Sequence, residues 1–258
     1  MSKIDLHLHT TASDGRYSPE EMVTKMAGPG LEVIAITDHD TVAGVAPAIT
    51  AARAFPQLTV ISGVEINTDG PQGETHILGY FINITDDNLI NNLENLRNSR
   101  HQRAQRILAK LAGLGLDISW SRVQELAGGG TICRPHIAQA LLEKGYVTSF
   151  NEAFTRYIGN DGPAYVERGK ITPEAAVKLI LAAGGLPVLA HPFTTGEVEP
   201  TVKRLKEAGL VGLEAYYKDY PEAQVRELVS LAQKYDLLVT GGSDYHGIDK
   251  NTETIPGT

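Results

Sequence analysis

The sequence predicts an α/β fold built on a parallel sheet or barrel. Segments with strand character and segments with helix character alternate along most of the 258 residues, which is typical of β-α-β units. The chain is 42% hydrophobic, and its length suits one large domain or a domain that carries an insertion. Several predicted strands end in histidine, aspartate or glutamate. Polar side chains would therefore gather where the strands end.

The N-terminal part predicts three strands separated by two helices. Apolar runs at 3–9, 31–37 and 58–66 have strand character, and the segments between them have helical patterns. Ser18 is the expected N-cap of the first helix, with Pro19 at the first helical position and Glu21 placed for a capping box. This order predicts parallel strands whose carboxyl ends share one rim. A further strand is predicted at HILGYFI, residues 76–82.

The middle of the chain predicts a helical insertion over residues 86–163. A long helix should begin near residue 86 and end near Gly113, shorter helices follow, and no convincing strand occurs before residue 164. The barrel would then be discontinuous, formed by residues 1–85 and 164–258, where helices and strands alternate again. Four arginines recur every three residues along the long helix: Arg97, Arg100, Arg103 and Arg106. Such a pattern is typical of a solvent-exposed face, although it could also line an entrance for the 5′ end of an RNA.

The composition argues against several classes of protein. A formal net charge of −8 argues against a broad electrostatic grip on nucleic acid, but not against a small phosphorylated substrate. The single cysteine, Cys133, cannot form an internal disulfide and is interpreted as structural. The sequence contains no apolar run long enough to span a membrane and no signal peptide at its start. We therefore expect a cytoplasmic protein without a membrane partner.

Histidines and carboxylates recur at the predicted strand ends. His7 and His9 lie two positions apart in the first strand, so their imidazoles face the same way and can converge on one metal ion. The other strand-end residues are Asp38 and His39 in IAITDHD, Glu65 in ISGVEI, His76, His191 in LPVLAH, and Asp244 and His246 in LLVTGGSDYH. In a parallel barrel these residues would become neighbours at one face. Clustering them without a cation would be costly.

Five short segments that contain these histidines and carboxylates resemble the motifs of a known family. HLHTTASDG, TDHD, GVEIN, AHP and GSDYHG resemble the successive motifs of the PHP (polymerase and histidinol phosphatase) family, and the resemblance is interrupted only by the helical insertion. It implies a deformed (β/α)7 TIM-like barrel with two or three divalent metal ions. RPHIAQALLEKG and YVERGKITPEAAV are similar to the branch of nucleoside 3′,5′-bisphosphate phosphatases and 5′-to-3′ exoribonucleases.

The resemblance also implies a set of metal ligands. The first site would use His7, His9, Glu65 and Asp244; the second Glu65 as a bridge with His76 and His191; the third Asp14, His39 and His246. Such mixed nitrogen and oxygen ligands suit Mn²⁺, Zn²⁺ or Fe²⁺ better than Mg²⁺ or Ca²⁺. Asp38 is expected to orient one of the ligand histidines.

Neighbouring metal ions favour phosphoester hydrolysis, because they activate a water and stabilise the charge on a phosphoryl group. The candidate catalytic residues are His191, His246 and Asp244. The proton for the leaving oxygen could come from His246, from His191 or from a water held by the metals. Arg134 and His136 in the RPH motif, and Arg168 and Lys170 in VERGKIT, are candidate substrate-binding residues. A guanidinium at a helix start suits phosphate oxygens.

The predicted reaction is hydrolysis of a phosphomonoester, the 3′-phosphate of nucleoside 3′,5′-bisphosphates, with 5′-to-3′ trimming of short RNA as a second activity. The alternatives are a histidinol-phosphatase-like or other small-metabolite phosphatase and a non-catalytic metal-binding module. A metal-dependent amidohydrolase is disfavoured, because Glu65 stands where those barrels carry a modified lysine and no lysine is expected at a strand end. The sequence leaves the oligomeric state and the metal open.

Overall fold

The chain forms two compact units. The computed structural model describes residues 3–28, 30–70, 73–167, 171–218, 220–247 and 256. One unit comprises Met1–Leu93 together with Lys170–Thr258, and the other comprises Glu94–Gly169. The second unit begins later than the insertion expected at 86–163, because the first turns of the long helix group with the barrel unit, and it extends to Gly169.

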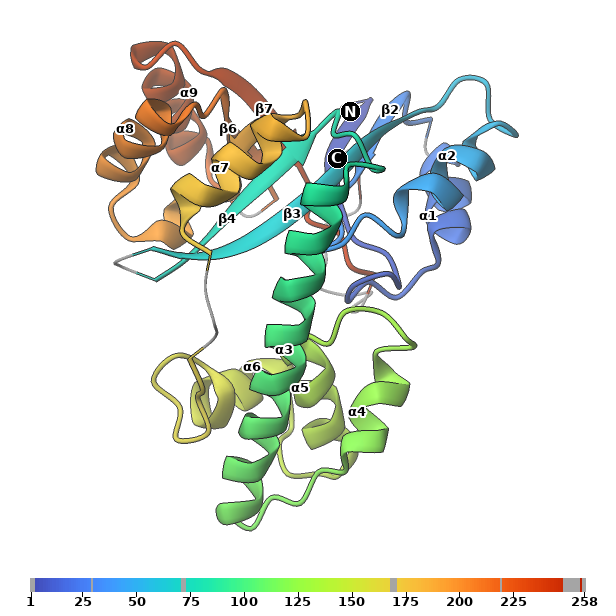
Figure 1. Cartoon of the computed structure of the whole chain (residues 1–258), viewed down its shortest axis with the longest axis vertical. Coiled ribbons are helices and arrows are strands. Elements are labelled where there is room, and N and C mark those ends of the chain that lie inside the picture. Colours follow the sequence, from blue (N-terminus) through green and yellow to red (C-terminus); the bar gives the residue numbers. More distant parts are fainter. Residues whose placement is uncertain are drawn as a thin grey trace. The chain divides into compact units, whose positions relative to one another are not determined.

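Seven strands of the described chain form one sheet in sequence order. They are β1 Ile4–Leu8, β2 Val33–Ile36, β3 Thr59–Gly70, β4 Gly73–Tyr80, β5 Leu186–Leu189, β6 Gly212–Tyr217 and β7 Leu238–Gly242. A bridge between Leu8 and Tyr245 joins the end of β1 to the segment after β7, so the sheet curls into a nearly closed barrel (Figure 1). The predicted α/β barrel is confirmed.

The barrel is deformed at β4. Strands β1, β2 and β3 are parallel, as predicted, but β4 runs antiparallel to both β3 and β5. No crossover helix separates β3 from β4, so the chain reverses directly into the neighbouring strand. This reversal pairs His76 with Asn67, two residues beyond Glu65 on β3.

Helices cover the outer face of the sheet. In the barrel unit they are α1 Pro19–Ala27, α2 Val45–Ala52, α7 Pro173–Ala182, α8 Val198–Ala208 and α9 Glu222–Lys234. The predicted capping box of α1 is confirmed: the Ser18 hydroxyl accepts the Glu21 N–H, and the Glu21 carboxylate accepts the Ser18 N–H. Helical spacing places Met22 and Met26 of α1 in one buried cluster with Ile34 of β2. Burial of each such side chain contributes about 1.5–3 kcal/mol.

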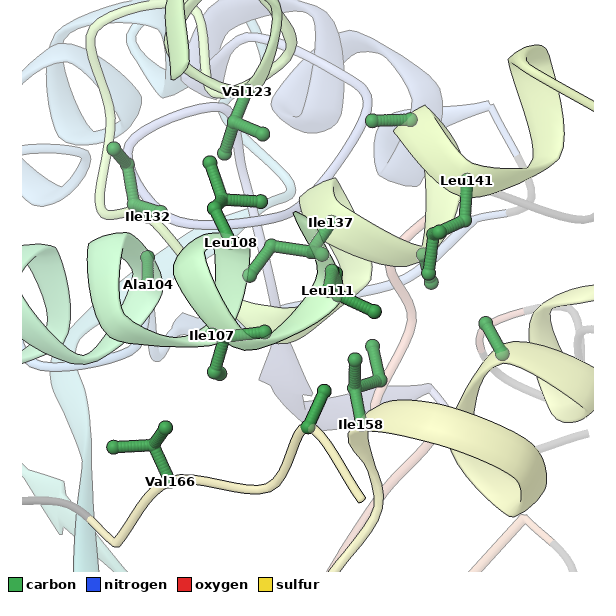
Figure 2. Close-up of a cluster of buried hydrophobic side chains, with 14 of the residues drawn as sticks. Ala104, Ile107, Leu108, Leu111, Val123, Ile132, Ile137, Leu141, Ile158 and Val166 are labelled. Carbon is green, nitrogen blue, oxygen red and sulfur yellow. The ribbon is translucent and has the colours of Figure 1, made fainter. Parts of the chain in front are cut away.

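The insertion unit is helical and has a core of its own. It contains most of α3 Asp87–Gly113, then α4 Trp120–Leu126, α5 Arg134–Glu143 and α6 Phe150–Ala153, which continues as a π-helical turn over Phe154–Ile158. Figure 2 shows Ile107 and Leu111 of α3 packed with Ile137 and Leu141 of α5. No helix in the described part of the chain is both long and apolar enough to cross a membrane.

The expected solvent-exposed arginine face of α3 is wrong at two positions. Arg106 is exposed, but Arg100 and Arg103 are each only 7% exposed. The Arg100 guanidinium contacts the Cys133 sulfur at 3.2 Å, and the Arg103 Nε donates to the Val166 carbonyl at 2.7 Å. A period of three on a helix rotates each arginine away from the last, so the four side chains do not share one environment.

Candidate metal centre

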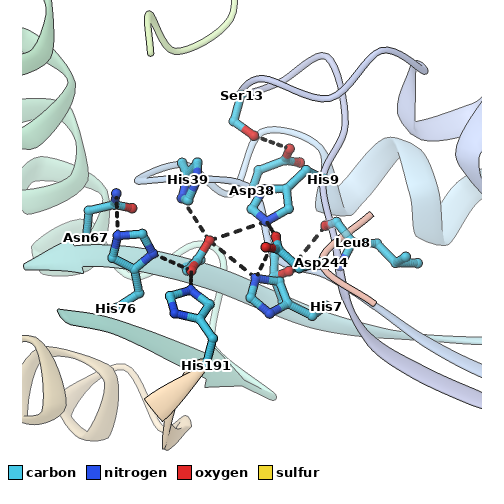
Figure 3. Close-up of polar contacts among 12 residues, drawn as sticks. His7, Leu8, His9, Ser13, Asp38, His39, Asn67, His76, His191 and Asp244 are labelled. Carbon is cyan, nitrogen blue, oxygen red and sulfur yellow. Dashed lines mark hydrogen bonds and ion pairs between the residues drawn. The ribbon is translucent and has the colours of Figure 1, made fainter. Parts of the chain in front are cut away.

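The two histidines of the N-terminal motif lie at the middle of a buried polar cluster (Figure 3). His7 belongs to β1 and His9 directly follows it; both side chains are completely buried, with ring centroids 5.1 Å apart. Each Nε2 lies 3.3 Å from Glu65 Oε2. Asp244 Oδ1 lies 3.4 Å from His7 Nε2 and 3.1 Å from His9 Nε2. Strand alternation therefore brings both imidazoles to one point, together with two carboxylates.

Glu65 is the centre of the cluster. Its Oε2 lies 2.8 Å from His39 Nδ1, while its Oε1 lies 2.7 Å from His76 Nδ1 and 3.1 Å from His191 Nε2. With His7 and His9, five imidazoles surround this one carboxylate. Burial alone would raise the pKa of Glu65, but the neighbouring imidazoles, His39 first among them, hold it well below the usual range. Glu65 is therefore a carboxylate at neutral pH.

Another carboxylate of the cluster, Asp14, lies close to three histidines. Its Oδ2 lies 3.8 Å from His39 Nε2, and its Oδ1 lies 3.4 Å from His246 Nε2 and 3.8 Å from His9 Nδ1. Burial opposes the charge of this aspartate, yet His39 and His246 keep its pKa well below the usual value. The structure thus places all nine predicted ligands in one connected cluster.

Three groups of ligand atoms in this cluster each lie within 4.8 Å of one another. They are His7, His9, Glu65 and Asp244; His39, Glu65 and His76; and His9, Asp14, His39 and His246. The first group equals the first predicted site. The second contains His39 where His191 was expected, and the third adds His9. Ligand assignment to individual ions, like the number of ions, remains a prediction.

The donor atoms fit divalent cations. Several inward-facing atoms are buried and make no hydrogen bond of regular geometry, although imidazole and carboxylate atoms lie close to one another: His7 Nε2, both ring nitrogens of His9, His39 Nδ1, Asp14 Oδ1 and Glu65 Oε2. Buried polar atoms without partners are costly. A cation held between them would satisfy these atoms together, and nitrogen with carboxylate oxygen is a donor set that divalent transition metals accept.

Two residues of the cluster have an unusual backbone conformation. His191, two residues after β5, has φ +25°, and Asp244, two residues after β7, has φ +50°. Non-glycine residues rarely adopt positive φ, and strain of this kind concentrates at functional sites. The turn at each strand end directs the side chain back toward the cluster.

Three residues on or next to β6 contact the cluster and were missed. Glu214 is fully buried and accepts bonds from His7 and the His191 N–H; the Tyr217 hydroxyl donates to Asp244. The available signal was an acidic residue inside the apolar run VGLEAY. The expectation that no lysine stands at a strand end was also wrong, since β6 extends to Tyr217 and Lys218 follows it. Its Nζ lies 3.2 Å from the Asp244 carbonyl oxygen, whereas Glu65 occupies the centre.

Asp38 has a different role from the one expected. Its carboxylate accepts hydrogen bonds from the Thr10 N–H, the Thr10 hydroxyl and the Ser13 hydroxyl, each at 2.7 Å. Asp38 therefore fixes the loop that follows His9, and these hydrogen bonds go to the loop rather than to an imidazole. The TDHD motif thus places His39 at the cluster and Asp38 beneath the loop.

Gly15 closes the same loop, and Gly15→Ala is expected to destabilise the protein by about 1–3 kcal/mol. A Cβ at this position would lie 2.2 Å from the His9 carbonyl oxygen and 2.5 Å from its carbon. The backbone would have to shift beneath a predicted ligand. Urea unfolding measures the effect. Gly113→Ala is the control, because a Cβ there meets nothing within 4 Å; equal stability of both variants would contradict the prediction.

The candidate substrate-binding residues belong to the insertion or lie outside the described residues. Arg168 and Lys170 lie outside the described residues. Arg134 begins α5, with Nη1 3.3 Å from the Asn160 side-chain oxygen. His136 is buried, and its Nδ1 accepts the Cys133 N–H at 3.0 Å, as part of the helix cap. Their role toward substrate remains a prediction.

Curated relatives match nearly the whole chain. The 5′-3′ exoribonuclease Rnm of Escherichia coli is 36% identical over 94% of this chain and 84% of its own length. A 3′,5′-nucleoside bisphosphate phosphatase of Chromobacterium violaceum is 30% identical over 95% of this chain and 88% of its own length. A phosphoribosyl 1,2-cyclic phosphate 1,2-diphosphodiesterase of Eggerthella lenta is 31% identical over 94% of both chains.

A solved structure and a family model agree with these relatives. The structure of a protein from Bifidobacterium adolescentis, described as a metal-dependent phosphoesterase, superposes with a TM-score of 0.90 at 30% identity, covering 99% of this chain and 92% of the other. Residues 5–157 match the model of the PHP domain. The resemblance seen in the sequence motifs is thereby confirmed: the chain belongs to the PHP domain family.

Proposed function

We propose that this PHP-family phosphoesterase removes the 3′-phosphate from nucleoside 3′,5′-bisphosphates. The observation that carries the proposal is the cluster of five imidazoles around Glu65. Its buried nitrogen and oxygen atoms suit the divalent ions of a metal-dependent hydrolase. The relative from C. violaceum, which is named for this reaction, supports the choice of substrate. No separate serine or cysteine nucleophile is needed, because a water can attack the phosphorus.

Trimming of short RNA from its 5′ end is proposed as a second activity, supported by the name of the E. coli relative. The two reactions share their chemistry. In a nucleoside bisphosphate and in a 5′-phosphorylated RNA, the bond between phosphorus and the first 3′ oxygen is broken. The substrates differ only in what the phosphoryl group carries beyond that bond.

Metal binding and proton transfer are separate roles in such a reaction. Bound divalent ions would supply Lewis-acid stabilisation of the phosphoryl charge and lower the pKa of a water. The proton for the leaving 3′ oxygen is proposed to come from a water held by the metal ions, or from whichever of His191 and His246 does not bind an ion. Their Nδ1 atoms are fixed by the Thr194 hydroxyl at 3.0 Å and by the Asp244 carbonyl oxygen at 2.9 Å. Each ring is thus oriented with its Nε2 toward Glu65 or Asp14.

A phosphate-release assay tests the proposal. The purified chain, loaded with Mn²⁺, Zn²⁺ or Fe²⁺, is given adenosine 3′,5′-bisphosphate, adenosine 3′-monophosphate, histidinol phosphate and a 5′-phosphorylated trinucleotide. We expect the bisphosphate to be the best source of phosphate and the trinucleotide to lose its 5′ nucleotide. Rapid hydrolysis of histidinol phosphate alone would support the histidinol-phosphatase alternative. Metal binding without hydrolysis of any substrate would identify a non-catalytic module.

Arg134→Ala tests whether this residue binds the 5′-phosphate of the substrate. A guanidinium bond to phosphate contributes roughly 1.5–3 kcal/mol, so the KM for the bisphosphate should rise roughly 10- to 150-fold. The KM for adenosine 3′-monophosphate, which lacks the 5′-phosphate, should stay unchanged. Arg156→Ala is the matched control, since this exposed arginine of the same unit pairs with Glu152. An unchanged preference for the 5′-phosphate would remove Arg134 from this role.

A further inference from the structure

Strand β6 contributes none of the predicted metal ligands, yet it contacts ligands from three other strands. Its Glu214 contacts His7 of β1 and the backbone of His191 after β5. Its Tyr217 contacts Asp244 after β7. The residues of β6 therefore lie behind the ligands, on the side away from the point where the ligand atoms meet.

An irregularity in β6 allows both residues to reach the cluster. Residues three apart on a regular strand point to opposite faces of a sheet. The pairing of β6 with β7 shifts register between Glu214 and Tyr216, and such a bulge redirects the following side chains. As a result, Tyr217 contacts Asp244 on the same side as Glu214, while Tyr216 is 59% exposed.

Glu214 fixes the orientation of His7. Its Oε1 lies 2.9 Å from His7 Nδ1, and its Oε2 accepts the His191 N–H at 2.7 Å. A carboxylate at Nδ1 keeps the proton on that nitrogen and leaves the Nε2 lone pair for a metal ion. His7 Nε2 is the nitrogen that faces Glu65 and Asp244.

Tyr217 fixes the orientation of Asp244. Its hydroxyl donates to Asp244 Oδ2 at 2.9 Å, which leaves Oδ1 facing the Nε2 atoms of His7 and His9. Lys218 Nζ bonds the Asp244 carbonyl oxygen at 3.2 Å. These contacts hold the side chain and the backbone of a residue whose φ is +50°, a conformation that non-glycine residues rarely adopt.

We infer that Glu214 and Tyr217 are positioning residues that set the metal affinity of the group His7, His9, Glu65 and Asp244. Neither side chain touches an atom of Asp14, His39 or His246 in the bonds described above, so an ion held by these three residues should depend on them much less. The inference rests on the metal dependence of the PHP fold and holds whichever phosphoester is hydrolysed.

The test is a calorimetric titration of Mn²⁺ into the metal-free full-length chain, comparing Tyr217→Phe with Tyr216→Phe. Both changes remove one hydroxyl from neighbouring tyrosines of β6, but only Tyr217 contacts a predicted ligand. Loss of a contact behind a ligand typically weakens metal binding 10- to 100-fold. We expect this loss for one class of ion in Tyr217→Phe, unchanged affinity for the ion held by Asp14, His39 and His246, and wild-type binding in Tyr216→Phe.

Two further measurements make the test decisive. The visible absorption of the Co²⁺-loaded protein reports ligand geometry, and it should change in Tyr217→Phe and not in Tyr216→Phe. Glu214→Gln keeps the shape of the side chain but can accept through only one oxygen, so it should weaken the same class of ion. If circular dichroism shows that metal-free Tyr217→Phe is unfolded, Glu214→Gln alone decides. Wild-type titration curves, or equal losses in both tyrosine variants, would overturn the inference.

These readouts separate the inference from the proposed substrate. Metal affinity and the Co²⁺ spectrum are measured without any phosphoester, so failure to hydrolyse adenosine 3′,5′-bisphosphate leaves them unaffected. Conversely, wild-type metal affinity in Tyr217→Phe would refute the positioning role even if that substrate is hydrolysed. In an active wild-type enzyme, excess Mn²⁺ should restore the rate of Tyr217→Phe, as expected for a defect in affinity alone.

Discussion

Glu65→Gln is expected to reduce kcat/KM by at least about 10³-fold, or roughly 4 kcal/mol of transition-state stabilisation. The Glu65 carboxylate lies within 3.3 Å of nitrogens from five histidines. The amide keeps the volume of the side chain but removes the charge that the cluster is built around. Two of the three groups of ligand atoms include Glu65, so we expect the bound metal content to fall together with activity.

Metal analysis after gel filtration and phosphate release at saturating Mn²⁺ measure these two effects. Glu174→Gln is the matched control, because Glu174 is partly exposed and pairs with Arg204 on the outer helices. Its activity and metal content should equal those of the wild type. Retention of full metal content and of wild-type activity by Glu65→Gln would show that the reaction does not depend on the centre described here.

The candidate site could be predicted from sequence because it follows the geometry of strands. Alternation by two places His7 and His9 on one side of β1, and parallel strands bring Glu65 to the same end of the barrel. The capping box at Ser18 was predictable for a similar reason, since the interaction spans only three residues.

The remaining features depend on tertiary contacts that no local pattern specifies. Glu214 lies in the middle of an apolar strand, where one acidic residue can face either the core or the solvent. Strand β4 runs antiparallel to β3, and the sequence between the two strands resembles that of any other strand connection. Asp38 follows the same strand as His39, but its loop contacts with Thr10 and Ser13 could be known only after the segments had folded together.

Chelation of divalent ions is expected to abolish phosphate release and to lower the thermal midpoint, and adding metal back should restore both. An ion present at 100 times its Kd stabilises the folded state by about 2.7 kcal/mol when the unfolded chain does not bind it. Differential scanning calorimetry of the chelated and reloaded protein measures the shift. An unchanged midpoint together with full activity after complete metal removal would contradict the prediction.

Metal affinity is also expected to rise with pH, because the metal-free cluster holds protons where ions must bind. Burial opposes a charge on His9, but Asp244 and Glu65 outweigh burial and raise its pKa to about 10. The pKa of His7 is also raised, since Glu214 and Glu65 overcome the cost of its burial. At neutral pH, below these pKa values, a metal ion must displace protons from the imidazoles to bind.

The metal affinity should increase, not decrease, as the pH rises. Raising the pH toward the elevated pKa of His9 removes the competing proton, so affinity should increase about tenfold per pH unit for each proton displaced. Calorimetric titrations between pH 6 and pH 8, in buffers of different ionisation enthalpy, count the released protons. A binding enthalpy that is the same in every buffer, with an affinity independent of pH, would mean that the imidazoles are already neutral. Proton release would instead show that the carboxylates Glu65 and Asp244 hold charge on the histidines until a metal ion takes its place.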